Sequence, residues 1–450
     1  MPAATRAAIT PEARDAGLVR GIGPGALTAV FVGILIGSGI FTVPAVMAAA
    51  VGAWAPLAYL GCAFAVGAVM ICFAEATSRV PTSGGVSGFV AAAFGPYWGF
   101  LTGMLNWASA AVAAGGIGAA SADVIGTVVP ALAAGPVRAI AIAGWFLTLA
   151  VINTTGVGIA ARFVTIVTSL KVVPLAVFVG VGVWFIDPAL LTLPLANVSG
   201  PGGGHADIGR AAIVGIFLFM GIETSLAVSG EVRDPARTIP RAVMAALFGY
   251  AALCIAIQLV AQGLLGAALG TSVAPLADAI GQVSPALRAG LVAGTAVSML
   301  GWTASDAISA PRMLFALSRD GFLPALLGRI HRRTHAPWIA CLAHAAIAAG
   351  LAISGSFIVL VVLSTLLAVM VYLIGSAAAL KLRADDIAHA GPPVRIPALP
   401  LIASIGVSAM IWVACQSTRQ EAIAIVVFIA ATSLIYSFRR RPGPAPAAVD

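Results

Sequence analysis

Charged residues are scarce in this sequence. Asp, Glu, Lys and Arg make up 9% of its 450 residues, against about 25% in soluble domains. Apolar residues make up 60% of the chain. A soluble chain of this length could not hide so much apolar surface, whereas a bilayer can cover it. The composition therefore predicts an integral membrane protein.

Several kinds of site are also missing. The five cysteines are scattered through apolar runs without a CxxC pair, and the five histidines show no metal-ligand spacing. We therefore expect no disulfide framework, no metal and no cofactor. No Walker motif is present, which argues against ATP coupling. The net charge of +8 comes from cations that lie between apolar stretches, so it indicates membrane orientation and not a nucleic-acid partner.

Long apolar runs are what the sequence does contain. A helix needs about 20 apolar residues to cross the hydrocarbon core, and an open sheet is excluded there because its backbone groups would lack partners. The sequence predicts an all-α fold of about twelve membrane spans, at residues 24–50, 55–77, 96–128, 137–153, 161–186, 208–230, 240–265, 286–316, 338–353, 356–382, 398–416 and 420–437.

The cations orient these spans. With the N-terminus inside, nineteen of the 24 Lys and Arg residues fall in cytoplasmic segments, four fall outside, and Lys171 falls within a span. The positive-inside rule then predicts a multi-pass protein of the inner (cytoplasmic) membrane, with cytosolic tails at 1–20 and 438–450. Between spans we expect a long external loop at 187–207, an external helical cap at 268–285 and a re-entrant or surface helix at 81–95.

The first span contains the triplet Gly37-Ser38-Gly39, with Gly33 before it and Pro44 after it. Glycine costs about 1 kcal/mol relative to alanine inside a helix, so the triplet is an expensive way to continue one. One interpretation is a helix break, whose free N–H groups and half-helix dipole face an anionic group. The other is a close-packing face of small residues. The triplet alone leaves both open.

The sixth span favours the break. It carries Gly221 and an acid, Glu223, at membrane depth. An intramembrane carboxylate is costly unless it is paired or wetted, so it is a functional candidate. A second interrupted span five helices after the first is the pattern of two inverted five-helix repeats.

The motifs GILIGSGIFTVP (33–44), FAEATSRVPTSGG (73–85), FLFMGIETSLAVSGEVRDPARTIPRAV (217–243) and SAPRMLFALSRDGFLP (309–324) make the chain resemble the amino acid–polyamine–organocation permeases. The resemblance implies a leucine-transporter-like fold: repeats at 21–186 and 208–383 with helices 1 and 6 broken, then two C-terminal helices in 396–437. It also implies a substrate site at the two breaks. N–H groups around Ser38, Gly39 and Ile40 would hold the substrate carboxylate. Carbonyls around Phe217, Phe219 and Met220 would hold its ammonium, and Ile36, Gly37 and Gly221 flank these groups.

The layout is most similar to the arginine/agmatine antiporters. That resemblance implies gating or stacking roles for Phe217, Trp302 and Tyr372, for which ordinary packing is the alternative. Asn106 stands where those antiporters carry an aromatic, so their substrate specificity does not transfer. A homodimer is also suggested by these relatives.

Ionisable residues inside spans are the remaining candidates. Lys171 either snorkels to the cytosolic face or, as the resemblance implies, takes the place of a coupling sodium ion and exchanges a proton. In the second case the implied fold places Asp306 near it, and we expect an ion pair between them. Glu223 either clasps helix 8 or 10 or has a gating or proton role. Glu231, Arg233 and Arg237 form either an inner gate or solvated loop charges, and His344 is expected to pack.

Taken together, these features predict a secondary transporter of amino acids or related amines, driven by protons or by exchange. A polyamine or basic amino acid–product antiporter is the nearest alternative. A channel would need a polar pore or filter, and a membrane-embedded enzyme would need a cluster of catalytic groups in a span. Neither is present, so we predict that the chain is not an enzyme.

Overall fold

The computed structural model describes residues 23–37, 39–81, 85–155, 171–191, 207–225, 232, 235–331, 334, 336–389 and 393–438. The regular elements of these residues are all helices. The tail at 1–20, most of the 187–207 loop and the chain after 438 lie outside the described residues.

Several helical stretches are long and apolar enough to cross a membrane. They are Gly39–Arg79, Pro96–Gly126, Gly135–Thr154, Arg237–Thr271, Phe357–Ala384 and Arg419–Ser437, and shorter apolar helices cover Gly85–Phe94, Val172–Phe185, Trp338–Ser354 and Leu399–Cys415. This confirms an all-helical architecture with several long apolar spans.

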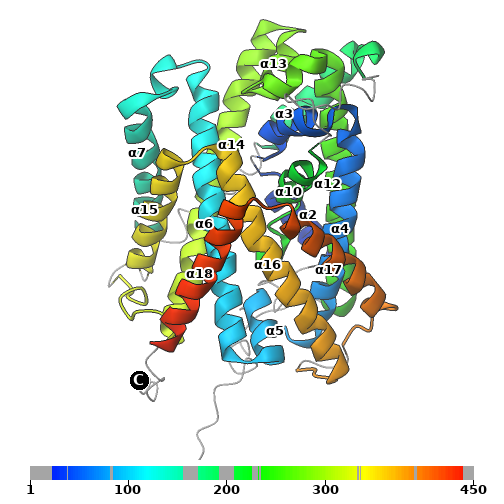
Figure 1. The fold of residues 1–450 in the computed structure, drawn as a ribbon. Helices are drawn as coiled ribbons and strands as arrows, with labels where there is room; N and C mark the ends of the chain where they lie inside the picture. The colour runs from blue at the N-terminus through cyan, green and yellow to red at the C-terminus, as the bar shows by residue number, and fades with distance from the viewer. Residues whose placement is uncertain are drawn as a thin grey trace, which may run out of the picture.

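Both interruptions expected from the sequence are present. In the first span, α2 (Pro24–Leu35) ends before the triplet and α3 (Gly39–Val51) begins at its last residue. In the sixth, α10 (Ile208–Leu218) and α11 (Ile222–Ser225) are separated by three non-helical residues. Figure 1 shows α2, α3 and α10 in the interior, between α6 on one side and α4 and α12 on the other.

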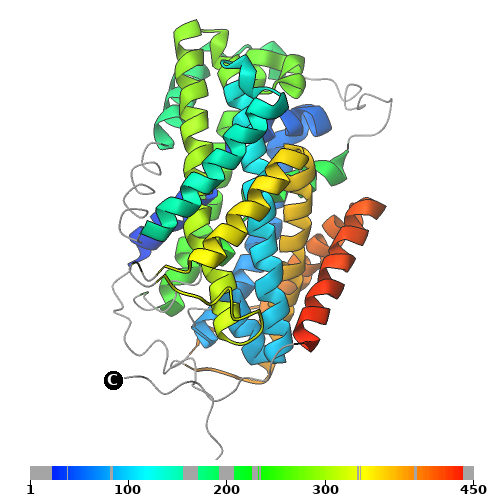
Figure 2. The same ribbon diagram turned by 90° about the vertical axis from the view of Figure 1, so that its left-hand side faces the viewer.

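Long helices enclose the broken pair. The long helices around it are α4 (Ala55–Arg79), α6 (Pro96–Gly126), α12 (Pro235–Leu265), α14 (Pro285–Arg319) and α16 (Phe357–Ala384), of which α4, α12 and α16 make the main contacts with it. Figure 2 shows α7 (Gly135–Thr155) and α15 (Trp338–Ser354) lying side by side across one face. The remaining long elements are α9 (Val172–Gly182), α17 (Leu399–Cys415) and α18 (Arg419–Ser437).

The shorter helices fall in connecting segments where the sequence predicted short helices. The segment predicted as a re-entrant or surface helix contains α5 (Gly85–Phe94). The predicted cap contains the 3₁₀ segment η7 (Gly266–Thr271) and α13 (Pro275–Gly281). Both helices of the cap begin or end at a glycine or proline, as is usual for short connecting helices.

A buried ion-pair network ties α4 to α16 at one end of the bundle. Glu75, which is fully buried, accepts hydrogen bonds from Arg79 at 3.0 Å, from Arg383 at 3.2 Å and from the Ile396 backbone at 2.9 Å. We call these residues, with Asp386, the inner clamp. Arg79 also reaches Asp386 at 3.4 Å. A hydrogen bond from Arg395, together with its charge, holds the pKa of Asp386 below its usual range, so that carboxylate stays ionised at neutral pH.

Candidate functional site

The two helix interruptions pack directly against each other. A Cβ added at Gly39 would lie 2.9 Å from Leu218 Cδ2 and 3.2 Å from the Phe217 ring. Gly221 has a φ of +115°, a conformation that side chains rarely adopt, and its Cβ would lie 2.6 Å from Ile34 Cγ2. The φ of Gly221 favours glycine, and a side chain at either position would have to displace Leu218, Phe217 or Ile34. The glycines are therefore what allows the two broken spans to meet.

The breaks leave backbone groups free of helical partners. Because α3 begins at Gly39, the N–H groups of its first turn, including that of Ile40, have no acceptor within the helix. At the end of α10 the backbone carbonyls likewise lack donors within the helix. Among the described residues, no backbone N–H donates to the carbonyls of Phe219 or Met220, whereas the Phe217 carbonyl accepts a long bond from Met220 N at 3.4 Å. Donors and acceptors thus meet at one place in the interior.

Trp302 brings a third span to the same place. Its indole lies against the first break: a Cβ added at Gly37 would be 3.1 Å from Trp302 Cδ1 and 3.2 Å from Nε1. Trp302 is only partly buried. An aromatic face beside free backbone groups is suited to contact the side chain of a bound molecule.

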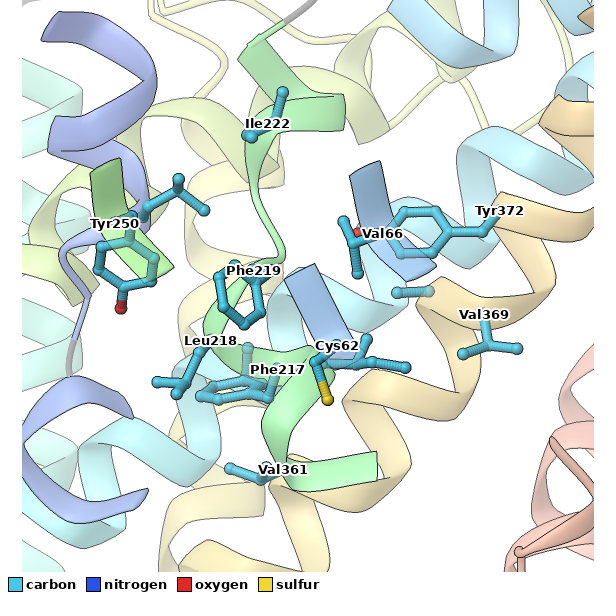
Figure 3. Packing of buried hydrophobic residues seen from close by; sticks show 14 of the residues in the cluster. Cys62, Val66, Phe217, Leu218, Phe219, Ile222, Tyr250, Val361, Val369 and Tyr372 are labelled. Carbon is cyan, nitrogen blue, oxygen red and sulfur yellow. The ribbon is translucent and has the colours of Figure 1, made fainter. Parts of the chain in front are cut away.

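The aromatic residues of α10 point in different directions. Phe217, which contacts Gly39, meets Phe357 of α16 edge-on at 6.5 Å between ring centroids. Phe219 faces away from the first break and packs edge-on against Tyr250 of α12 at 5.7 Å. Figure 3 shows Phe217, Leu218 and Phe219 at the end of α10, with the chain running on without helix to Ile222. Phe217 is therefore the aromatic of this helix that borders the break.

Glu223 is held by two hydrogen bonds at the start of α11. Its Oε2 accepts from the Gly221 N–H at 2.9 Å and from the Tyr372 hydroxyl at 3.1 Å. Tyr372 is fully buried in α16 and meets Phe73 of α4 edge-on at 6.0 Å. Of the two interpretations of Glu223, the clasp predicts a contact with the tenth span, and the hydrogen bond to Tyr372 of α16 is such a contact. A gating or proton role is compatible with the same contact.

We expect Tyr372→Phe to lower the free energy of unfolding by about 1.5–3 kcal/mol, because it removes a hydrogen bond to a buried carboxylate. Urea or thermal unfolding in detergent measures the change. Tyr59→Phe is the matched control: it removes a neutral bond to Gln258 at 3.0 Å and should cost about 0.5–1.5 kcal/mol. A loss for Tyr372→Phe no larger than that of the control would contradict the clasp.

The predicted ion pair between Lys171 and Asp306 is wrong. Asp306 pairs instead with His344 of α15, at 2.8 Å between Oδ2 and Nε2. Lys171 immediately precedes α9 and is 2% exposed. A Cβ on Gly294 of α14 would lie 2.7 Å from Pro174 of α9, so α9 meets α14 three turns before Asp306. The lysine is therefore at the wrong level of α14 to reach that carboxylate.

Other predicted residues lie away from the breaks or cannot be placed. Asn106 of α6 faces Met313, with Nδ2 4.0 Å from Sδ. Met313 is eleven residues beyond Trp302, or about 16 Å along the helix, so the structure does not bring Asn106 to Trp302. Ser38 of the predicted substrate site lies outside the described residues. So do Glu231 and Arg233 of the predicted inner gate, whereas Arg237 is exposed.

Sequence reasoning missed some residues that the structure brings into contact. Leu218 and Ile34 close the breaks, and His344 is the partner of Asp306. The apolar pair carries no signal that separates it from other span residues. The pairing of His344 did have a signal in the sequence. His344 and Asp306 are isolated ionisable residues in consecutive predicted spans, and such residues commonly pair with one another. The described residues contain no group of three or more His, Cys, Asp or Glu side chains placed to hold a metal ion.

The chain resembles known membrane transporters over almost its whole length. It is 28% identical to the methylthioribose transporter of Bacillus subtilis, over 95% of each chain. It is also 28% identical to a branched-chain amino acid permease of Lactococcus lactis, over 85% of this chain and 86% of the relative. An uncharacterized transporter of Mycobacterium tuberculosis is 30% identical over 85% and 84%.

The sequence pattern of the amino acid permease family matches residues 22–438, a range that contains both helix breaks, Trp302 and the buried pairs described above. The chain therefore belongs to the amino acid permease family of multi-pass membrane transporters, and it is not an enzyme.

Proposed function

We propose that this protein is a secondary active transporter that carries amino acids with apolar side chains across the cytoplasmic membrane by alternating access. The observation that carries the proposal is the meeting of the two helix breaks beside Trp302. Broken helices whose free backbone ends converge in the interior are the usual substrate site of transporters built from inverted repeats. We propose the corresponding leucine-transporter-like arrangement, with twelve spans and both termini cytoplasmic.

In this proposal the two breaks bind the groups that all amino acids share, at a site that we call the substrate seat. N–H groups of Ser38, Gly39 and Ile40 at the start of α3 hold the carboxylate, helped by the positive end of the helix dipole. Carbonyls around Phe217, Phe219 and Met220 at the end of α10 hold the ammonium. The direction of each half-helix supports this assignment, because α3 begins and α10 ends at the site.

The side chains around the breaks support an apolar substrate. Ile34, Phe217, Leu218 and Trp302 are the side chains that contact the break glycines. The ionisable residue nearest to the second break in sequence is Glu223, and its Oε2 already accepts two hydrogen bonds. A cationic side chain would rely on acidic or aromatic partners, here Oε1 of Glu223 and the Trp302 ring. The apolar majority of these contacts favours an apolar substrate over the polyamine alternative. A branched-chain amino acid permease among the relatives agrees with this substrate class.

The distribution of cations supports the proposed orientation. Nineteen of the 24 Lys and Arg residues fall on the side assigned to the cytoplasm and four on the other, and the positive-inside rule counts these cations. Three of the four outside are also paired with acids: Arg138 with Asp123, Arg210 with Glu421 and Arg288 with Asp278. Protons or exchange drive transport in this proposal, and Lys171 and Glu223 remain candidate coupling residues.

The test is a binding screen on the purified protein in detergent. L-Leucine, L-isoleucine and L-valine should raise its unfolding temperature in a concentration-dependent way, whereas arginine, agmatine and putrescine should not, because only a true ligand stabilises by mass action. We expect Trp302→Ala to weaken leucine binding about tenfold, since each CH2 group that loses apolar cover costs about 0.8 kcal/mol and about 1.4 kcal/mol is a factor of ten.

Trp184→Ala is the control for the loss of a tryptophan, because Trp184 is 84% exposed. It should leave leucine binding unchanged. Stabilisation by the cationic compounds alone would contradict the apolar substrate class, and equal binding of leucine by both alanine variants would contradict the role of Trp302.

A further inference from the structure

A buried histidine–carboxylate pair joins α14 to α15, outside the proposed substrate seat. His344 Nε2 and Asp306 Oδ2 are 2.8 Å apart, and the two side chains are 2% and 6% exposed. Ionisable groups at membrane depth are costly, so those that occur there commonly serve ion or proton movement. A bond between two helices could be made far more cheaply by neutral groups, as Ser109 and Ser364 do between α6 and α16.

The second ring nitrogen of His344 has no hydrogen-bond partner among the described residues. Nδ1 is buried and makes no hydrogen bond to any residue that the structure describes. Buried polar atoms are almost always satisfied, so an exception asks for a reason. With Asp306 ionised, Nε2–H donates to the carboxylate and Nδ1 keeps its lone pair. The ring is therefore placed to accept one further proton, and the carboxylate would stabilise the resulting imidazolium.

The pair is coupled to the substrate seat through α14. Asp306 lies four residues after Trp302, so the two side chains share a face of the helix about 6 Å apart along its axis. Trp302 in turn contacts Gly37 at the first break. A change of charge at Asp306 and His344 can thus alter the position of the helix that lines the seat.

Few other ionisable groups surround the pair in the described part of the chain. Arg312 lies on α14 beside Cys341 of α15, one turn before His344. Lys171 precedes α9 and makes no ion pair with Asp306. The acids of α6 and α13, Asp123 and Asp278, are bound to Arg138 and Arg288 at the outer end. Among the described ionisable side chains, His344 is therefore the one that pairs with the Asp306 carboxylate.

We infer that His344 and Asp306 form a proton-binding site of the transport cycle, separate from the substrate seat. The inference rests on the proposed function, since it assigns the group that couples transport to protons. One proton from water adds to Nδ1, which converts the pair from a net charge of −1 to zero, and it leaves from the same atom on the other side of the membrane. Because Nδ1 is buried here, both exchanges take place in other states of the cycle.

The test uses His344→Gln in proteoliposomes, because the glutamine amide can still donate to Asp306 but does not titrate near neutral pH. We expect leucine exchange at equal pH on both sides to stay within about twofold of the wild type. Accumulation driven by an inward pH gradient should fall at least tenfold. Trp145→Phe is the control: it removes another polar bond to this part of α14, from Nε1 to Thr303 at 2.9 Å, and no titratable group.

A second measurement covers the case in which His344→Gln loses all transport. Leucine is added to purified protein in weak buffer and proton uptake is followed with an indicator dye. The wild type should take up or release protons on binding, and His344→Gln and Asp306→Asn should do so at least threefold less. Gradient-driven accumulation or proton exchange equal to that of the wild type would overturn the inference. If the wild type exchanges no leucine at all, the proposed function fails instead.

Discussion

Gly37→Val is expected to reduce leucine uptake about a hundredfold while the protein still folds. A Cβ added at this position would lie 3.1 Å from the Trp302 indole, and valine adds two further methyl groups to the same space. Overpacking a filled site costs about 1–3 kcal/mol, and each 1.4 kcal/mol is a factor of ten in binding. Initial rates of labelled leucine uptake into proteoliposomes measure the effect.

Two further variants separate this effect from general damage. Gly144→Val is the control, because Gly144 lies in α7 with nothing within 4 Å of its Cβ position; it should transport normally. Trp302→Ala, added to Gly37→Val, makes room for the valine and should recover part of the loss, since substitutions in contact are not additive. Normal leucine uptake by Gly37→Val would contradict the assignment of the seat.

Glu75→Ala is expected to destabilise the protein by about 3–5 kcal/mol, because it leaves a buried guanidinium without its main partner. Arg79 is fully buried, and the other hydrogen bonds of its guanidinium to described residues, Asp386 and the Ile387 carbonyl, are both 3.4 Å long. The unfolding temperature in detergent should fall by several degrees. Chemical unfolding gives the free energy directly.

The controls for the inner clamp lie in the same region. Lys381→Ala removes an exposed pair with Asp385 at 2.7 Å and should cost about 0.3–0.5 kcal/mol. Replacing both Glu75 and Arg79 with alanine should destabilise less than Glu75→Ala alone, because no charge is then left buried without a partner. A loss for Glu75→Ala as small as that of Lys381→Ala would show that the clamp is not a stabilising network.

The helix breaks could be predicted because their signal is local. Glycine is unfavourable within a helix, and the triplet at 37–39 concentrates that cost. An acid two residues after Gly221 marks the second break in the same way. The span pattern is also local, since it depends on runs of apolar residues. Each of these features can be recognised without knowing which helices touch.

The side-chain pairings could not be predicted, because they depend on which helix faces meet. Asp306 was assigned to Lys171, although His344 was equally available as an isolated ionisable residue in a span. Glu75 and Arg383 are 308 positions apart, and no periodicity in the sequence links them. The resemblance to antiporters places Asn106 at the site, and the structure instead sets it opposite Met313.

The central claim is that the two helix breaks bind an amino acid that is then carried by alternating access. The most direct measurement is counterflow of labelled L-leucine into proteoliposomes loaded with unlabelled L-leucine. A carrier with this seat should accumulate label transiently, with a rate that saturates, and loading with D-leucine should abolish the effect. A flux that rises linearly with concentration and shows no transient accumulation would contradict the account.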